Sequence, residues 1–389
     1  LPILCFDVGS RTNNSGLLHI YDIDELLKRL PLNTLDVSCG AGLSPVWREW
    51  LKHPTNDEYW RQYGFQGRHD KFTMPALFVG GWYDYYPTAT LEAWRKIPHA
   101  KVILGPWGHH HGLAPTPDGR RAVDFGVENN FDCHLIYRRW YDHVFKGLGP
   151  GYPPIQIFVM GRNQWRAEQE WPLARTRYTD FYLHTGGALS QTAPQAEPAD
   201  RYDYDPANPV PTRGGNHSIG PWNDSYKNYI WCGPCDQRPI EARPDVLTYT
   251  TAPLEQDLEV TGPVVLKLWA ATSARDTDFV ARLCDVYPDG RSINITEGVV
   301  RARYRTSETP QLIEPGAVLE YTLSLQDTSN VFLKGHSIRV QVTSSNFPLW
   351  DRNLNTGADQ NHSTDMVVAH HEIRHDRRYP SRLILPVIP

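Results

Sequence analysis

The sequence has 389 residues, of which 40% are hydrophobic and 21% are charged, and its formal net charge at pH 7 is −5. This length exceeds that of one ordinary domain and allows two or three hydrophobic cores. The small excess of acidic over basic residues argues against a nucleic-acid partner, because binding to phosphates requires a surplus of lysine and arginine. No run approaches the roughly 18 apolar residues of a membrane-spanning helix, so we expect a soluble protein without a membrane partner, either cytoplasmic or secreted.

The six cysteines are too few and too scattered to predict a disulfide framework. Cys232 and Cys235 have the C-x-x-C spacing of redox proteins, but they follow a Trp-rich loop and do not open a strand–helix unit. We therefore favour two loop thiols or one local disulfide over a redox role. No second C-x-x-C pair and no suitably spaced histidine pair accompany them, so the sequence predicts no metal site and no cofactor.

Residues 1–62 are predicted to be helical and rich in loops. Apolar residues at helical spacing over residues 22–30 predict an amphipathic helix that ends before Pro31. Pro45 is suited to the first turn of a second helix, which carries an aromatic face. A third, short helix is predicted over residues 56–63. Aromatic side chains at this spacing are more typical of a packed core than of a ligand site.

Residues 74–111 carry the pattern around which the chain is organised. Two short apolar runs, over residues 76–79 and 101–104, flank a helical pattern, and this order predicts a parallel sheet. Asp84 follows the first strand and His109 follows the second. Reactive groups of open parallel sheets lie beyond the carboxyl ends of the strands. An acid followed by a base is also the order of the last two triad members in α/β-hydrolases.

A long helix is predicted over residues 133–145, because four apolar side chains at helical spacing form one face. These side chains are Leu135, Ile136, Trp140 and Val144. Glycines and a proline over residues 147–151 end the helix and mark a domain boundary. After this boundary the pattern changes to period two, which indicates strands. The predicted strands cover residues 155–159, 178–183, 246–250, 264–269, 279–286, 299–304, 318–325, 338–343, 366–371 and 382–385.

These strands follow one another with no predicted helix between them, which indicates a β-sandwich. The long interval over residues 186–244 is rich in proline, glycine, asparagine and aspartate, and a compact domain tolerates such a segment only where it packs on other elements. We predict that its aromatic side chains pack against the first sheet. They are Tyr202, Tyr204, Trp222, Tyr226, Tyr229 and Trp231.

Two motifs, Gly80-Gly81-Trp82-Tyr83-Asp84 and Gly105-Pro106-Trp107-Gly108-His109, resemble the paired signatures of the cocaine esterase family of serine hydrolases. This family also contains X-Pro dipeptidyl peptidases, α-amino-acid ester hydrolases and glutaryl-cephalosporin acylases. The likeness continues through Arg139-Trp140-Tyr141-Asp142-His143 and Phe158-Val159-Met160-Gly161 to the last residues. It covers the chain almost continuously from near Trp47 onward.

The resemblance implies an α/β-hydrolase of which this chain holds the carboxyl-terminal half of the sheet, with a helical cap remnant and a carboxyl-terminal all-β jelly-roll sandwich. The corresponding domains are residues 1–62 for the cap remnant, 63–152 for the half hydrolase domain and 153–389 for the jelly roll. A cap of this kind would allow tryptophan and tyrosine side chains to line an apolar substrate pocket.

An enzyme of this family needs a nucleophilic serine in a G-x-S-x-G elbow that precedes the acid and the base. The sequence has no such motif before Asp84, and the nearest imitation, at residues 215–220, has the wrong spacing and follows His109. We therefore expect this chain to be the carboxyl-terminal part of a longer enzyme, in which an amino-terminal segment supplies the serine. If this chain is the whole protein, it is expected to be inactive.

The resemblance assigns the roles of acid and base to Asp84 and His109 in the hydrolysis of a small-molecule ester or amide through an acyl-enzyme. Asp84 would orient the imidazole, and His109 would take the proton from the serine. Two further histidines follow His109 directly and compete for the role of base, but the family pattern selects the first histidine after Gly-Pro-Trp-Gly. Tyr86 and Trp82 are the expected substrate contacts, and packing under the cap is the alternative for Tyr86.

Four aspartates lie at predicted strand ends without the glycine-bearing loop that a calcium site uses. They are Asp276, Asp278, Asp285 and Asp289. We favour a solvated sheet edge or salt bridges from these carboxylates to Arg282, Arg301 and Arg303 over a metal site. The stretch 351–353 is predicted to be structural and to hold the sandwich to the hydrolase domain.

A second hypothesis comes from another class of protein. In it the chain is a catalytically inactive binding module, whose jelly roll recognises a carbohydrate or a protein while the remainder serves as a scaffold. The presence of both Asp84 and His109 within intact motifs argues against this hypothesis. The sequence leaves open whether the protein forms a homo-oligomer.

Overall fold

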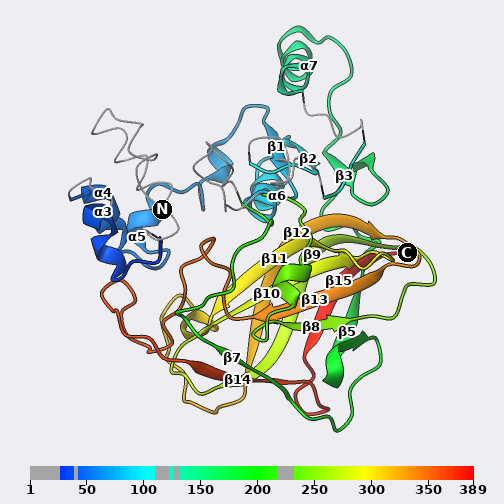
Figure 1. Ribbon diagram of the computed structural model, residues 1–389. Helices are drawn as coiled ribbons and strands as arrows, with labels where there is room; N and C mark the ends of the chain where they lie inside the picture. Colours follow the sequence, from blue (N-terminus) through cyan, green and yellow to red (C-terminus); the bar gives the residue numbers. More distant parts are fainter. Residues whose placement is uncertain (1–26, 39–42, 110–121, 127–131, 218–231) are drawn as a thin grey trace.

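The computed structural model describes residues 27–38, 43–109, 122–126, 132–217 and 232–389, and two sheets form within these ranges. The smaller sheet has four strands and the larger has eleven. In Figure 1 the small sheet lies beside one end of the large sheet, and a group of short helices from the start of the described chain lies to the side. We call residues 27–72 the helical segment and the large sheet with its loops the β domain.

The helices among the described residues are mostly short. They are the 3₁₀-helices η2 (Leu32–Thr34), η3 (His69–Lys71), η5 (Thr185–Gly187) and η6 (Ala302–Tyr304), and the α-helices α3 (Leu35–Ser38), α4 (Pro45–Trp50), α5 (Glu58–Arg61), α6 (Pro87–Lys96), α7 (Cys133–Lys146) and α8 (Arg238–Glu241). The predicted start of a helix at Pro45 is confirmed, because the Ser44 side chain caps α4 by accepting from the Trp47 N–H. The helix predicted over residues 56–63 is observed as the shorter α5. The helix predicted over residues 22–30 lies mostly outside the described residues.

The small sheet has the order β1-β2-β3-β4, formed by β1 (Leu77–Gly81), β2 (Lys101–Gly105), β3 (Ile155–Val159) and β4 (Gln164–Glu168). The pairs β1–β2 and β2–β3 are parallel, and β3–β4 is antiparallel. Helix α6 supplies the crossover that the parallel pair β1–β2 requires. The predicted order of strand, helix and strand is therefore confirmed.

The prediction that residues 155–159 begin the sandwich is wrong. β3 pairs with β2 instead, with Ile155 opposite Val102. Ile155, Ile157 and Phe158 are all fully buried, so neighbouring side chains on both faces of β3 are covered. Burial on both faces is usual for a parallel strand. Periodicity identified the strand correctly but could not identify its partner.

The β domain contains a mainly antiparallel sheet of order β11-β10-β13-β8-β6-β5-β15-β9-β14-β7, in which β12 also pairs with β9. Its strands are β5 (Arg177–His184), β6 (Ala188–Ser190), β7 (Asp200–Tyr204), β8 (Leu247–Thr250), β9 (Leu258–Thr272), β10 (Asp278–Val286), β11 (Ser292–Arg301), β12 (Leu319–Phe332), β13 (Ser337–Thr343), β14 (Ala369–Arg374) and β15 (Arg382–Ile388). Strands β4, β6 and β7 were not predicted. The jelly-roll arrangement stays a prediction.

Helix α7 has almost the predicted bounds. Its Asp132 side chain caps the start by accepting from the Leu135 N–H, and Gly147 ends the helix with a φ of 64°. Trp140 packs against Ile103 and Trp107, as an apolar face requires. Leu135 does not share that face, because it is 58% exposed. No helix in the described ranges is long and apolar enough to cross a membrane.

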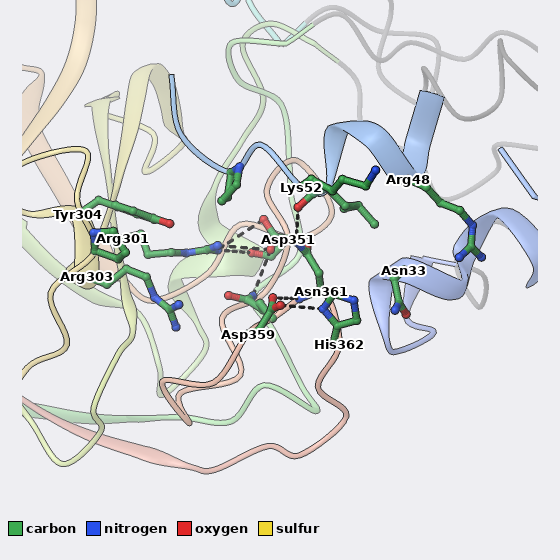
Figure 2. Close-up of a pocket in the computed structure, with 14 residues that line it drawn as sticks. Asn33, Arg48, Lys52, Arg301, Arg303, Tyr304, Asp351, Asp359, Asn361 and His362 are labelled. Atoms are coloured by element: carbon green, nitrogen blue, oxygen red, sulfur yellow. Dashed lines mark hydrogen bonds and ion pairs between the residues drawn. The ribbon is translucent and has the colours of Figure 1, made fainter. Parts of the chain in front are cut away.

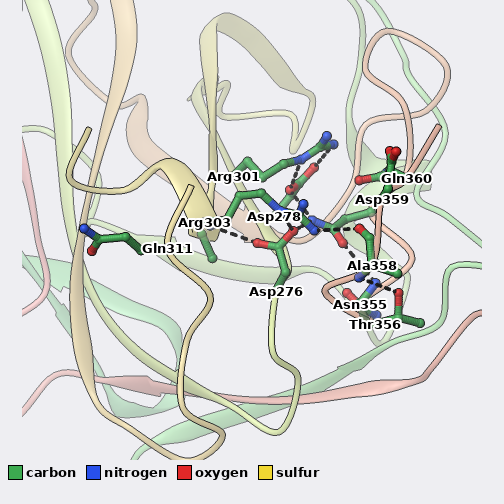
Figure 3. Close-up of polar contacts among 12 residues, drawn as sticks. Asp276, Asp278, Arg301, Arg303, Gln311, Asn355, Thr356, Ala358, Asp359 and Gln360 are labelled. Atoms are coloured by element: carbon green, nitrogen blue, oxygen red, sulfur yellow. Dashed lines mark hydrogen bonds and ion pairs between the residues drawn. The ribbon is translucent and has the colours of Figure 1, made fainter. Parts of the chain in front are cut away.

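The aspartates at the strand ends form ion pairs, which Figure 3 shows for the two at the start of β10. Asp276 binds Arg303 at 2.7 Å and Asp278 binds Arg301 at 2.8 Å, while the Asn353 amide donates to both carboxylates. The other two aspartates have different partners. Asp285 pairs with His336 at 2.8 Å, and Asp289 pairs with Arg291 at 2.8 Å.

The loop over residues 351–353 joins the β domain to the helical segment rather than to the small sheet. The Arg352 guanidinium donates to the carbonyls of Lys28 and Pro206. Nearby, the Asn361 side chain donates to the Leu51 carbonyl at 3.0 Å. A cavity of about 730 Å³ lies between the two parts, and Figure 2 shows the charged side chains that line it. The predicted structural role stands, but its predicted partner is wrong.

The aromatic residues of the interval 186–244 do not all pack as predicted. Tyr202 and Tyr204 are buried within the β domain, where their hydroxyls contact Ser344 Oγ at 2.8 Å and the Asn353 carbonyl at 3.2 Å. Their alternating positions on β7 place both on the covered face of that strand. The remaining four aromatic residues of this interval lie outside the described residues.

A buried ion pair crosses from β10 to β11. Arg282 Nε donates to Glu297 Oε2 at 2.9 Å, and the side chains are 3% and 1% exposed. The same guanidinium donates to the amide oxygens of Gln237 and Gln341, both at 3.0 Å. The predicted pairing of Arg282 with an aspartate is wrong, because Glu297 lies directly opposite it in the strand register.

We predict that Arg282→Met destabilises the β domain by about 3–5 kcal/mol, because it leaves the Glu297 carboxylate buried without its cation. Urea unfolding followed by tryptophan fluorescence measures this loss. Arg291→Met is the matched control, since the Arg291–Asp289 pair is exposed and should matter much less. Equal losses in the two variants would contradict the prediction.

Candidate active site

The candidate site begins where β1 and β2 end. Beyond the strands the backbone continues to pair, since the Trp82 N–H donates to the Gly105 carbonyl at 2.8 Å and the Tyr83 N–H donates to the Trp107 carbonyl at 3.0 Å. The Asp84 N–H closes a tight turn on the Gly81 carbonyl at 3.1 Å. The two polar turns therefore leave the sheet side by side.

Glycines make this close approach possible. A Cβ atom on Gly81 would lie 1.9 Å from the Trp107 carbonyl oxygen, which no side chain tolerates. A Cβ atom on Gly105 would lie 2.5 Å from the Trp107 ring. Gly81 thus has a steric reason that depends on the packing of the two strand ends, whereas Gly105 leaves room for the Trp107 ring of its own motif.

The structure brings Asp84 and His109 together. His109 Nδ1 lies 3.2 Å from both Oδ1 and Oδ2 of Asp84. The Asp84 side chain is 11% exposed, whereas that of His109 is 42% exposed. The Tyr85 N–H also donates to Asp84 Oδ1, at 2.6 Å. A buried carboxylate that contacts one ring nitrogen can fix the tautomer of a more exposed imidazole.

Tyr86 lies next to this pair. Its ring centroid is 5.9 Å from that of His109, and the residue is 53% exposed. Partial burial, with a smaller contribution from the Asp84 charge, raises the pKa of the Tyr86 phenol, so its hydroxyl stays protonated and able to donate. Its role as a substrate contact stays a prediction. His110 and His111 lie outside the described residues.

Trp82 is not a substrate contact in this structure. It is fully buried, and its indole N–H donates to the Phe158 carbonyl at 2.8 Å. Its ring stacks on Trp171 with a centroid distance of 6.0 Å. The prediction is wrong because the turn directs Trp82 into the core between the sheets while Asp84 faces His109.

A buried serine–histidine contact elsewhere in the β domain does not offer an alternative site. Ser344 Oγ lies 3.2 Å from His371 Nε2, but the two residues are 0% and 1% exposed. Burial lowers the pKa of His371 to about 3, so its imidazole is a poor base at neutral pH. Its Nδ1 has no hydrogen-bond partner among the described residues, hence no carboxylate orients it.

The environment of Cys235 argues against a redox role for the C-x-x-C pair. The residue is 5% exposed, and its backbone N–H donates to Asn294 Oδ1 at 2.7 Å. Burial raises the pKa of the Cys235 thiol to about 11. Redox cysteines instead have a lowered thiol pKa, since the thiolate is the reactive form.

The comparisons with known proteins agree with the two motifs. Residues 21–111 match the X-Pro dipeptidyl-peptidase (S15 family), and this range contains both Asp84 and His109. Residues 150–384 match the X-Pro dipeptidyl-peptidase C-terminal non-catalytic domain, which is more than half of the chain. The chain belongs to the X-Pro dipeptidyl-peptidase and cocaine esterase family.

Among relatives in this family, the cocaine esterase of Rhodococcus sp. strain MB1 Bresler is 39% identical over 359 residues. The alignment covers 87% of this chain and 60% of the esterase, so the chain spans less than two thirds of that relative.

Solved structures of the family share the fold. An aminopeptidase from a marine sediment Thaumarchaeota archaeon is 28% identical, with a TM-score of 0.81. The match covers 94% of this chain and 64% of the aminopeptidase chain. An α-amino acid ester hydrolase is 26% identical, with a TM-score of 0.80. This match covers 93% of this chain and 63% of the ester hydrolase chain. The fold of this chain is therefore that of an α/β-hydrolase of this family with a carboxyl-terminal β domain.

We predict that Gly81→Ala separates the two polar turns and lowers the unfolding temperature, because its Cβ would meet backbone atoms of Trp107. Gly80→Ala is the matched control. The nearest neighbour of its Cβ would be the flexible end of the Leu104 side chain, at 3.0 Å, and no backbone atom lies among its nearest neighbours, so it should be tolerated better. Thermal unfolding by circular dichroism compares the two variants, and a loss as large for Gly80→Ala would refute the steric explanation.

We predict that native Cys235 resists alkylation by iodoacetamide at pH 8, because a buried thiol with a pKa of about 11 is almost entirely protonated there. Peptide mass spectrometry before and after denaturation measures the modification. Cys133, which is only partly buried at the start of α7, is the internal reference. Labelling of Cys235 as fast as that of Cys133 would contradict the prediction.

Proposed function

We propose that this chain is part of a serine hydrolase that cleaves carboxylic ester or amide bonds through an acyl-enzyme. The observation that carries the proposal is the contact between His109 Nδ1 and the Asp84 carboxylate at the ends of two parallel strands. The named relatives, an esterase, an aminopeptidase and an ester hydrolase, support it as hydrolases of acyl bonds. In this proposal the large sheet is a jelly roll and the helical segment belongs to the cap.

Asp84 would hold the proton of the imidazole on Nδ1, which leaves His109 Nε2 as the base. His109 takes the proton of the serine hydroxyl as the serine oxygen bonds to the acyl carbon. It then gives that proton to the departing alcohol or amine, and the acyl group stays on the serine. In the second half a water molecule bonds to the acyl carbon while His109 accepts its proton. The bond between the acyl carbon and the serine oxygen then breaks, the carboxylic acid leaves, and His109 returns the proton to the serine oxygen.

We place the nucleophilic serine in a segment outside these 389 residues. Two observations support this placement. The sequence has no G-x-S-x-G motif before Asp84, and the alignment covers 60% of the Rhodococcus esterase. That amino-terminal segment would be the principal protein partner of the site. Tyr86, which borders His109, would contact the small-molecule substrate.

In the full-length protein, Asp84→Asn and His109→Ala are each predicted to lower kcat for p-nitrophenyl butyrate by about 10⁴-fold, because the serine loses its oriented base. A fluorophosphonate probe should label one serine of the unsubstituted protein and label the two variants far more slowly. The matched control is His362→Ala, which removes an exposed histidine paired with Asp359 and should retain activity.

Two results would overturn the proposed function. One is full-length protein that neither hydrolyses esters nor reacts with the fluorophosphonate probe. The other is unchanged kcat in both Asp84→Asn and His109→Ala. The first result would favour the alternative of a catalytically inactive binding module, and the second would mean that other residues perform the acid–base chemistry.

A further inference from the structure

The β domain contacts the turn that carries Asp84 on both sides of the acid. We define the Asp84 turn as residues 82–88. On one side, Asn216 Nδ2 donates to the Trp82 carbonyl. On the other side, Thr88 Oγ1 donates to Asp327 Oδ2 at 2.7 Å. These partners lie 134 and 239 residues away along the chain, and both belong to the β domain.

The contact between Thr88 and Asp327 is reciprocal and partly buried. The Asp327 N–H donates back to Thr88 Oγ1 at 3.0 Å, and the Trp171 indole donates to Asp327 Oδ1 at 2.7 Å. Asp327 is only 5% exposed. Two hydrogen bonds therefore join Asp327 to Thr88, which lies at the end of the Asp84 turn and in the first turn of α6.

A bulge in β12 places Asp327 at this junction. The register between β12 and β9 shifts between Ser324 and Asp327, and Gln326 has a φ of 68°. A non-glycine residue rarely adopts this left-handed conformation unless the surrounding structure holds it there. Bulges of this kind redirect side chains, because an extra residue breaks the alternation of the strand. The irregularity in β12 thus coincides with its contact to Thr88.

Asn216 is also held in place by buried contacts. Its backbone N–H donates to Glu297 Oε1 at 3.2 Å, and Glu297 is itself held by Arg282 at 2.9 Å and by the Asn346 amide at 3.0 Å. Gly215, which precedes Asn216, has a φ of 110°, and a Cβ atom there would lie 1.9 Å from Glu297 Oε1. The buried ion pair of the β domain therefore supports the side chain that reaches Trp82.

We propose that Asp327 and Asn216 are positioning residues, which hold the Asp84 turn so that the Asp84 carboxylate meets His109. This inference rests on the proposed function of Asp84 and His109. It assigns the β domain a part in the site although neither residue touches the imidazole. A displacement of about 1 Å in a catalytic group can cost up to about 100-fold in rate, so contacts that fix the turn can control turnover.

The test replaces Thr88 in the full-length enzyme. Thr88→Val keeps the shape of the side chain but removes the hydroxyl, whereas Thr88→Ser retains it. We expect Thr88→Val to lower kcat between about 10-fold and 100-fold with KM nearly unchanged, and Thr88→Ser to stay close to the original enzyme. Asn216→Ala should resemble Thr88→Val, and Asp327→Asn provides a near-isosteric substitute if Thr88→Val fails to fold.

A double-mutant cycle separates positioning from general stabilisation. If Thr88 acts through Asp84, then Thr88→Val should change kcat little in an Asp84→Asn background, because the acid is already lost. Independent, additive effects of the two substitutions would overturn the inference. The matched control is Tyr249→Phe, which removes a buried hydroxyl contact to Asp200 within the β domain and should leave kcat unchanged.

The outcomes distinguish this inference from the proposed function. Loss of activity in Asp84→Asn together with unchanged kcat in Thr88→Val and Asn216→Ala would overturn the inference alone. Unchanged activity in Asp84→Asn, or no hydrolysis by the full-length protein, would overturn both. A tenfold or greater loss in Thr88→Val, absent in Thr88→Ser and not additive with Asp84→Asn, would support it.

Discussion

The close fit of two parallel strand ends is the constraint on which the site depends. The Tyr83 N–H reaches the Trp107 carbonyl at 3.0 Å, and this approach exists only because Gly81 has no side chain. It brings an acid and a histidine that lie 25 residues apart to 3.2 Å. Because the two turns begin on strands of one sheet, the geometry of the pair is set by the sheet more than by flexible loops.

The β domain supplies the second support for this arrangement. In its interior, Arg282 and Glu297 form a buried ion pair. At its edge toward the small sheet, polar side chains form hydrogen bonds with the Asp84 turn. Two of its irregular backbone positions, Gln326 and Gly215, lie beside these contacts. Departures from regular strand geometry tend to occur where a structure serves a site, because the local cost is offset by packing elsewhere.

Local patterns predicted elements better than they predicted partners. The spacing of apolar residues placed α7 within one residue of its observed end, and it found the strand, helix and strand around α6. The same reasoning assigned residues 155–159 to the wrong sheet, because alternation identifies a strand without identifying its neighbour. Trp82 was predicted to contact substrate, yet its place in a motif does not reveal which way its side chain points.

The sequence by itself determined the strand, helix and strand around α6, the family resemblance and the pairing of Asp84 with His109, since strand periodicity, glycine-bearing turns and the succession of Asp84 and His109 are local features. Only the tertiary structure decided the burial of Trp82 and the partners of the Asp84 turn. Thr88 meets Asp327 across 239 residues, through a bulge whose register no local pattern encodes. Contacts of this kind depend on how two separately formed sheets pack, and that packing exists only in the folded chain.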